Sequence, residues 1–165
     1  FKMENLWAPW RMEYIGKGDK PKGCIFCAEA LQDDPELVVY VDELVTVRMN
    51  KYPYSNAHLL VAPVKHTASL AELKVTESMA LIAMVTKAVE ILKDAFHPEG
   101  FNVGLNLGKA AGAGVDEHLH FHIVPRWNGD TNFMTVTADI RVIPEHIIAT
   151  AAKLRPYFNH LKNDL

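Results

Sequence analysis

The chain has 165 residues, of which 49% are hydrophobic and 22% are charged, and its formal net charge is −3. These values fit one compact domain over residues 1–165 and argue against two full domains. The slightly acidic balance also argues against a surface that binds nucleic acid, which is normally basic, so any phosphate-bearing ligand would be held locally.

No apolar stretch reaches the length of a membrane span, and the opening FKMENLWAPWRMEYI lacks the basic and apolar regions of a signal peptide. We therefore expect a cytoplasmic protein without a membrane partner.

The first half of the chain predicts three strands after an aromatic-rich extension, residues 1–16. The β-branched runs at 37–41 and 45–49 are separated by Asp42-Glu43 and are typical of a hairpin. A turn-rich stretch then leads to a third strand, HLLVAP at 58–63.

The second half contains a long amphipathic helix, predicted from Thr76 as N-cap to Phe96 by apolar residues at three- and four-residue steps. A fourth strand, FNVGLNL at 101–107, follows it, and EHLHFHIVPRW at 117–127 is a fifth. Beyond these we expect a short strand near 133–137 and a C-terminal helix, 144–160, as a second extension.

The order hairpin, strand, long helix, strand, strand, with short final links, favours an antiparallel sheet with a helix on one face. We therefore expect an α+β fold rather than a doubly wound parallel sheet. Neither a strand-linked GxGxxG nor a GxxxxGK[ST] phosphate loop is present.

Three histidines alternate in the fifth strand, His118, His120 and His122. Because side chains alternate between the faces of a strand, all three would share one face, with neighbouring rings roughly 6–7 Å apart. A single strand histidine is usually a satisfied core residue, but three neutral rings bring up to six ring nitrogens that need partners. This face therefore needs a ligand, a metal ion or water.

Two chemistries fit that face. One is a metal site, since His-x-His can chelate zinc and Asp116 and Glu117 lie nearby. The other is phosphate-ester chemistry, with the middle imidazole as nucleophile and its neighbours as proton donors and orienters. The preceding loop, GKAAGAGV, lets the backbone approach an anion and offers it N–H groups, although such composition is also ordinary for turns.

The stretch HLHFHIV resembles the signature of the histidine-triad (HIT) superfamily of nucleotidyl hydrolases and transferases. NKYPYSNAHLLVAP, GFNVGLNLG and HLHFHIVPRW occur in that family's order and spacing. The flanking LWAPWRMEYI, Glu117 and PRWNGDTNF look closest to the branch that cleaves dinucleoside polyphosphates, and within it to bacterial diadenosine tetraphosphate phosphorylases.

The resemblance implies that His120 attacks the α-phosphorus and carries the nucleotidyl group, while His122 contacts the phosphate and His118 completes the catalytic triad. It also implies a set of nucleotide-binding positions. These are Asn50 at the ribose, His58 beside the phosphates, Asn106 near the phosphate, and Gly112, Gly114 and Glu117 around the loop.

One departure from the family concerns the leaving group. Fragile-histidine hydrolases carry a glutamine, and nucleoside phosphoramidase relatives a serine, where this chain has Gly112-Ala113-Gly114-Val115. The side-chain contact to the bridging oxygen is therefore missing or replaced by backbone N–H groups, which argues against a hydrolase-like leaving-group step.

Cys24 and Cys27 are spaced too closely for a typical structural disulfide, and CxxC is common in metal and redox sites. Some HIT relatives bind a structural zinc with a CxxC pair, a histidine after the third strand and the first triad histidine. Those positions match Cys24, Cys27, His66 and His118; the alternative is free thiols in a loop and a surface His66.

The resemblance also implies a homodimer that joins two sheets across a two-fold axis. Three rival functions stay open at this point: a hydrolase of the same nucleotides, a nucleotide- or zinc-binding module without catalysis, and a metallohydrolase that uses all three histidines.

Overall fold

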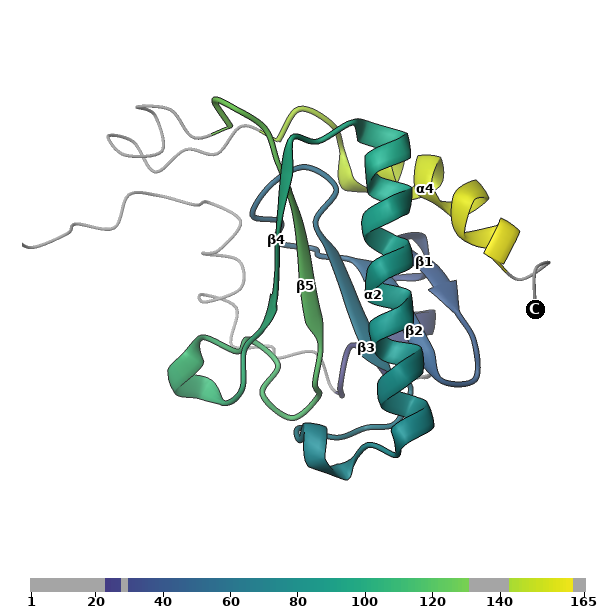
Figure 1. The fold of residues 1–165 in the computed structure, drawn as a ribbon, viewed down its shortest axis with the longest axis vertical. Coiled ribbons are helices and arrows are strands. Elements are labelled where there is room, and N and C mark those ends of the chain that lie inside the picture. Colours follow the sequence, from purple (N-terminus) through teal and green to yellow (C-terminus); the bar gives the residue numbers. More distant parts are fainter. Residues whose placement is uncertain (1–22, 28–29, 131–142, 162–165) are drawn as a thin grey trace, which may run out of the picture.

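The computed structural model describes residues 23–27, 30–130 and 143–161. The aromatic segment 1–16 and the strand expected near 133–137 lie outside these ranges. Five antiparallel strands form one sheet in the order β1-β2-β3-β5-β4 (Figure 1). Their bounds are β1 Val38–Val41, β2 Val45–Met49, β3 Leu59–Pro63, β4 Gly100–Leu105 and β5 Phe121–Arg126.

Two helices lie on one face of this sheet (Figure 1). The long helix α2, Val75–Phe96, contacts β3, β5 and β2, and α4, Ile147–Leu161, contacts β1 and α2. The predicted element order and the α+β architecture are therefore confirmed. No helix in the described ranges is long and apolar enough to cross a membrane.

The ends of both helices differ from the sequence prediction. α2 begins two residues early, because the Lys74 backbone N–H donates to the Glu77 carboxylate (2.7 Å) and Lys74, not Thr76, is the N-cap. α4 begins at Ile147 rather than 144, because His146 caps it: its ring accepts the Ile148 N–H and its carbonyl accepts the Thr150 N–H.

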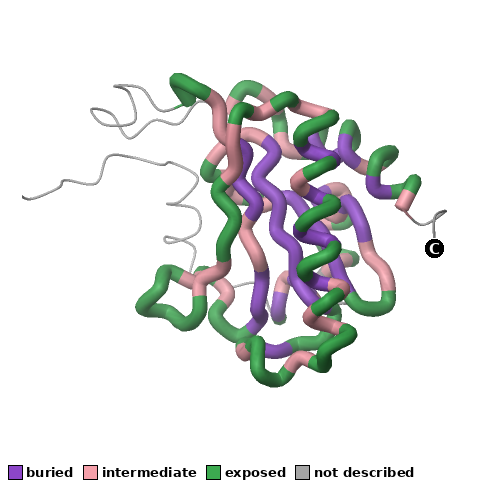
Figure 2. Tube along the Cα trace, in the orientation of Figure 1, coloured by how far each residue is buried: buried purple, intermediate pink, exposed green. Residues whose placement is uncertain are grey.

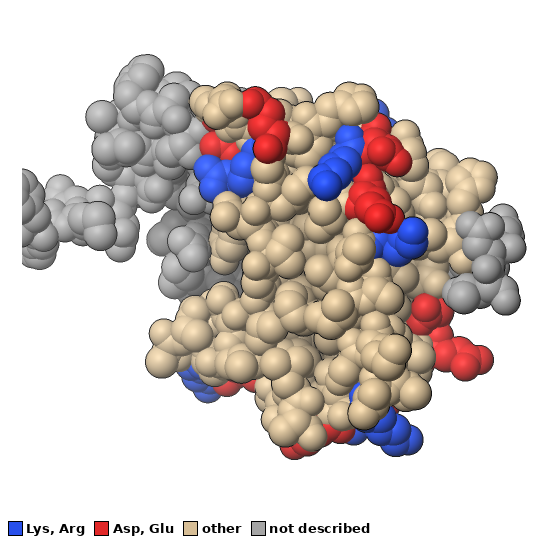
Figure 3. Space-filling model, viewed as in Figure 1, with Lys and Arg blue, Asp and Glu red and all other residues tan. Residues whose placement is uncertain are grey.

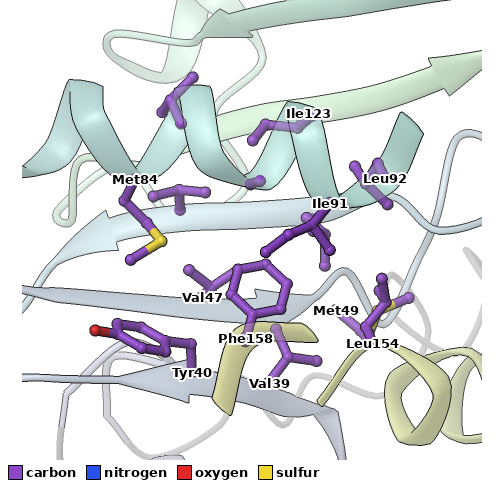
Figure 4. Close-up of a cluster of buried hydrophobic side chains, with 14 of the residues drawn as sticks. Val39, Tyr40, Val47, Met49, Met84, Ile91, Leu92, Ile123, Leu154 and Phe158 are labelled. Carbon is purple, nitrogen blue, oxygen red and sulfur yellow. The ribbon is translucent and has the colours of Figure 1, made fainter. Parts of the chain in front are cut away.

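The main core fills the space between the sheet and the two helices (Figure 4). Strand positions that face α2 are buried, whereas the outer face of α2 is exposed (Figure 2). Largest among the fully buried side chains of this core are Phe158, Met49, Leu59, Leu81, Leu92, Ile123 and Leu154. Arg155 links α4 to the start of β1 and to the turn before it, because its guanidinium donates to the carbonyls of Val38 (3.1 Å) and Glu36.

Acidic and basic side chains are mixed on the described part of the face that α2 covers: blue and red atoms lie beside one another there, and no broad basic patch is seen on this face (Figure 3). On α2 itself, Lys87 and Glu90 form an ion pair (3.0 Å).

Candidate functional site

The histidine segment divides its side chains between the two faces of the sheet. Leu119 and Ile123 join the main core under α2. On the opposite face a second cluster of buried residues surrounds the histidines: Cys24, Phe26, Leu60 and Ala62. The predicted alternation is therefore confirmed.

The strand itself is shorter than predicted, since β5 begins at Phe121 and only His122 of the triad lies within it. The reason is a set of contacts with the segment after β3. The Leu119 N–H donates to the Thr67 carbonyl (2.7 Å), and His118 Nε2 lies 2.8 Å from the Pro63 carbonyl oxygen. These contacts hold the first two histidines ahead of the sheet.

His120 is 5% exposed, and its Nδ1 lies 2.8 Å from the carbonyl oxygen of His118. Because a carbonyl oxygen can only accept, Nδ1 carries the proton and Nε2 keeps the lone pair. Burial lowers the pKa of His120, so the ring is neutral at pH 7. A neutral imidazole with an unprotonated Nε2 is a competent nucleophile.

The proton position on His122 follows from a chain of contacts that starts at Tyr54. The Tyr54 backbone N–H donates to His58 Nδ1 (3.1 Å), so the proton of His58 must be on Nε2. His58 Nε2 lies 3.0 Å from His122 Nδ1 and donates to it, which leaves the His122 proton on Nε2. The ring centroids of His120 and His122 are 4.9 Å apart. The site therefore pairs a lone pair on one ring with an N–H donor on the next.

Desolvation by burial, and secondly the nearby His120, lower the pKa of His122 to about 4. His122 is therefore a neutral hydrogen-bond donor at pH 7 rather than a fixed positive charge.

His58 is fully buried behind His122, and both of its ring nitrogens are engaged. The contact with a phosphate that the resemblance implies would therefore act through His122. Asn50 supports the same arrangement: its Oδ1 accepts the Tyr52 N–H (2.9 Å), which turns its Nδ2 toward His58 (3.2 Å).

The loop expected to approach an anion lies between β4 and the histidines. Gly108 and Gly112 adopt φ of 80° and 86°, values that L side chains rarely adopt, around a 3₁₀ turn at Lys109–Ala111. Asn106 lies against this loop, because its Nδ2 would be 3.9 Å from a Cβ at Gly112. Gly114 and Glu117 are exposed. Asn106 and the loop are thus neighbours.

Four side chains converge beside His118, namely Cys24, Cys27, His66 and His118, with all ligand atoms within 4.8 Å of one another. His118 Nδ1 lies 3.1 Å from Cys24 Sγ and 3.2 Å from His66 Nδ1, and Cys27 Sγ lies 3.3 Å from His66 Nδ1. Tetrahedral zinc with these ligands would set such separations at about 3.3–3.8 Å. The predicted grouping of these four residues is confirmed.

The donor atoms also suit a metal ion chemically. His118 Nε2 donates its proton to the Pro63 carbonyl, so the Nδ1 that faces the cysteines carries a lone pair. Burial raises the pKa of the Cys24 thiol to about 11, and a cation would be needed to hold its thiolate.

Two further residues adjoin this cluster. Phe26, between the cysteines, is 1% exposed and packs on the His118 and His120 rings. Arg48 in β2 is 3% exposed, and its guanidinium donates to the Ile25 carbonyl. Sequence reasoning missed Arg48, although one charged residue within the apolar run VTVRM was a usable signal.

The family model for the HIT domain matches residues 32–129. The chain belongs to the HIT family. It is 40% identical over 153 residues to AP-4-A phosphorylase of Mycobacterium tuberculosis, covering 87% of this chain and 78% of the relative. It is 30% identical over 131 residues to adenosine 5'-monophosphoramidase hnt1 of Schizosaccharomyces pombe, covering 79% and 95%.

Solved structures of HIT proteins share the fold. A zinc-bound histidine triad family protein from Mycobacterium smegmatis has a TM-score of 0.67 and 28% identity, covering 87% of this chain and 98% of that one. A histidine triad nucleotide-binding protein from Sulfolobus tokodaii also has a TM-score of 0.67 and 28% identity, covering 86% and 96%. The relatives named for a reaction are nucleotide-processing enzymes, and this HIT protein shares their family.

Proposed function

We propose that this HIT protein cleaves dinucleoside polyphosphates of the diadenosine tetraphosphate type, and that it passes the nucleotidyl group through His120 to inorganic phosphate. The observation that carries the proposal is the pairing of an unprotonated Nε2 on His120 with an Nε2–H on His122 next to it. The 40% identity to an AP-4-A phosphorylase supports the choice of substrate and acceptor.

In the first step, His120 Nε2 attacks the α-phosphorus, forming an N–P bond as the P–O bond to the leaving nucleoside triphosphate breaks. The His118 carbonyl holds the Nδ1 proton of His120 and stabilises the positive charge that develops on the ring. The His122 Nε2–H would donate to a phosphoryl oxygen.

In the second step, an oxygen of inorganic phosphate attacks the same phosphorus, and the N–P bond breaks. The nucleoside diphosphate leaves, and His120 returns to its neutral form with its proton on Nδ1. The overall products from diadenosine tetraphosphate and phosphate are then ADP and ATP.

The phosphates would lie over the loop at 108–114, beside Asn106. Two features support this placement: the positive φ angles that bring the backbone close, and the exposure of Gly112 and Gly114. Asn50 would contact the ribose, and Glu117 would lie at the rim.

Zinc would be held by Cys24, Cys27, His66 and His118. With four protein ligands its role would be structural, fixing the segment that carries the nucleophile, and it would supply no open coordination position to a substrate. The His118 contacts disfavour a metallohydrolase built on all three triad histidines. Its Nδ1 faces the cysteines and its Nε2 faces Pro63, so it cannot share one ion with His120 and His122.

Assembly as a homodimer is also proposed. β4 is the last strand of the sheet, and in the described ranges no strand pairs with its outer edge. Val103 on this strand is 45% exposed. Pairing of two such edges would join the sheets, and the mass of the purified chain in solution tests this point.

The deciding experiment is the product spectrum from diadenosine tetraphosphate with and without inorganic phosphate, resolved by ion exchange. ADP plus ATP, formed only with phosphate, is the expected result. AMP plus ATP in both conditions would instead assign the hydrolase reaction. His120→Asn should abolish turnover while nucleotide binding is retained, whereas no turnover by the unmutated protein would leave a binding module.

A further inference from the structure

The loop between the two cysteines reaches beyond the metal cluster to the nucleophile. Phe26 extends from this loop, and its ring centroid lies 4.8 Å from that of His120 and 5.1 Å from that of His118. The two ring planes of Phe26 and His120 meet at 31°. Phe26 therefore covers one side of the imidazole that carries the reacting nitrogen.

The His120 ring has only one hydrogen bond to hold it in the described part of the chain. Its Nδ1–H binds the His118 carbonyl, and Nε2 must stay open for the phosphorus. A ring held by this one hydrogen bond can still rotate about the Nδ1–H···O axis. A packing surface is therefore needed to fix the direction of the Nε2 lone pair. Phe26 supplies that surface, because it is 1% exposed and rests on Leu60 and Ala62 of β3.

The Cys24–Cys27 loop is held by hydrogen bonds at its ends and at its midpoint. Gly23 enters it with φ of 119°, and the Cys27 N–H donates to the Cys24 carbonyl (3.1 Å) to close a turn. Arg48 donates from β2 to the carbonyl of Ile25, the residue before Phe26. Arg48 is buried on the sheet face that bears the histidines, opposite Leu60, which in turn pairs with His122.

We propose that Phe26 is a positioning residue for His120, and that the Cys24–Cys27 loop with Arg48 forms the frame that holds it. The inference rests on the proposed role of His120 as nucleophile. It gives the CxxC loop a second role, because the loop that holds the metal also orients the group that attacks phosphorus.

The test compares Phe26→Leu with Phe158→Leu. Both phenylalanines are buried in the described structure (1% and 0% exposed), but Phe158 extends from α4 and packs against Tyr40 of β1, on the other face of the sheet. The same substitution therefore removes a ring of similar burial far from the histidines. Zinc content and melting temperature are measured for both variants, and the rate of covalent nucleotidylation is measured by rapid quench with α-labelled diadenosine tetraphosphate.

We expect Phe26→Leu to lower the nucleotidylation rate by about 10–10²-fold, as misplacement by a fraction of an ångström does, with little change in KM and unchanged zinc content. Phe158→Leu should lower the melting temperature but leave the rate within about twofold. The ¹⁵N spectrum of the histidine side chains should show the Nδ1–H tautomer of His120 in both variants, because the His118 carbonyl that sets it is unchanged, so that a lower rate in Phe26→Leu reports the direction of the ring and not its protonation.

Equal nucleotidylation rates in the two variants would overturn the inference, because Phe26 would then contribute only to core packing. If Phe26→Leu loses zinc, Phe26→Met, which fills more of the ring's volume, takes its place with the same criteria. Arg48→Met should lower the rate in the same direction with the ring and ligands intact, and an unchanged rate would refute the part assigned to Arg48. A wild-type protein that forms no covalent adduct would refute the proposed function instead.

Discussion

The neutral state of His122 predicts a loss of stability in mild acid. Its pKa is about 4 in the folded protein and 6.5 in an unfolded chain. The unfolded state therefore binds a proton on this group at pH values where the folded state does not, so the free energy of unfolding falls as the pH drops below 6.5 and stops falling on this account below about 4.

Between pH 7.5 and pH 5, this single group should remove about 2 kcal/mol from the free energy of unfolding, because nearly the whole unfolded population is protonated at pH 5. Burial also lowers the pKa of His118 and of His120, so their contributions have the same sign.

Urea denaturation of the wild type and of His122→Asn at both pH values isolates the contribution of His122. The asparagine Oδ1 can take over the acceptor role of Nδ1 toward His58, and the metal cluster is common to both proteins, so its acid sensitivity cancels in the comparison. We expect the wild type to lose about 2 kcal/mol more than His122→Asn. Equal losses would show that burial does not hold His122 neutral, and the proton assignment built on it would fail.

Other consequences concern the metal and the core. Cys24→Ser should abolish stoichiometric zinc binding and lower the melting temperature. A chelator should lower the melting temperature of the wild type but not that of the variant. If a chelator instead stops turnover without changing the melting temperature, the metal is catalytic. Leu154→Ala, at a fully buried position on α4, should lower the free energy of unfolding, measured by urea denaturation, by about 2–5 kcal/mol. Leu70→Ala, at a position that is 44% exposed, should lower it by less than about 0.5 kcal/mol. Equal losses in the two variants would refute the packing of α4 against the core.

The sequence predicted those parts of the molecule that depend on local periodicity. The strands β1 to β4 and the helix α2 follow from alternating and three- to four-residue apolar patterns, and the alternation of the histidines gave the correct face. The grouping of Cys24 and Cys27 with His66 and His118 came from family resemblance, because no spacing rule links residues so far apart in the chain.

The features that could not be predicted from the sequence depend on contacts between segments that are distant in the chain. β5 starts late because Leu119 is bonded to Thr67, and nothing near Leu119 in the sequence signals that partner. The family resemblance placed His58 beside the phosphates, but only the fold shows that its two ring nitrogens contact the backbone N–H of Tyr54 and the ring of His122. Arg48 was overlooked because its partner, a carbonyl in the cysteine loop, carries no sequence signature.

The three chemically identical rings of the triad adopt two tautomers: the proton is on Nε2 in His118 and His122, and on Nδ1 in His120. Main-chain groups make these assignments: the Pro63 carbonyl for His118, the His118 carbonyl for His120, and the Tyr54 N–H, through His58, for His122. Because no side-chain substitution removes a main-chain group, the proton positions are insensitive to most mutations around the site.

His118 also connects the cysteine–histidine cluster to His120, the proposed nucleophile, in a way that is separate from Phe26. Its ring joins the cysteines, while its own carbonyl oxygen receives the Nδ1 proton of His120. A change at the proposed zinc ligands would therefore move both the proton acceptor and the packing surface of His120, whereas Phe26→Leu changes the packing surface alone. Comparing nucleotidylation by Cys27→Ser and Phe26→Leu separates the two links: a larger loss in Cys27→Ser measures how much of the nucleophile's alignment comes through the His118 backbone.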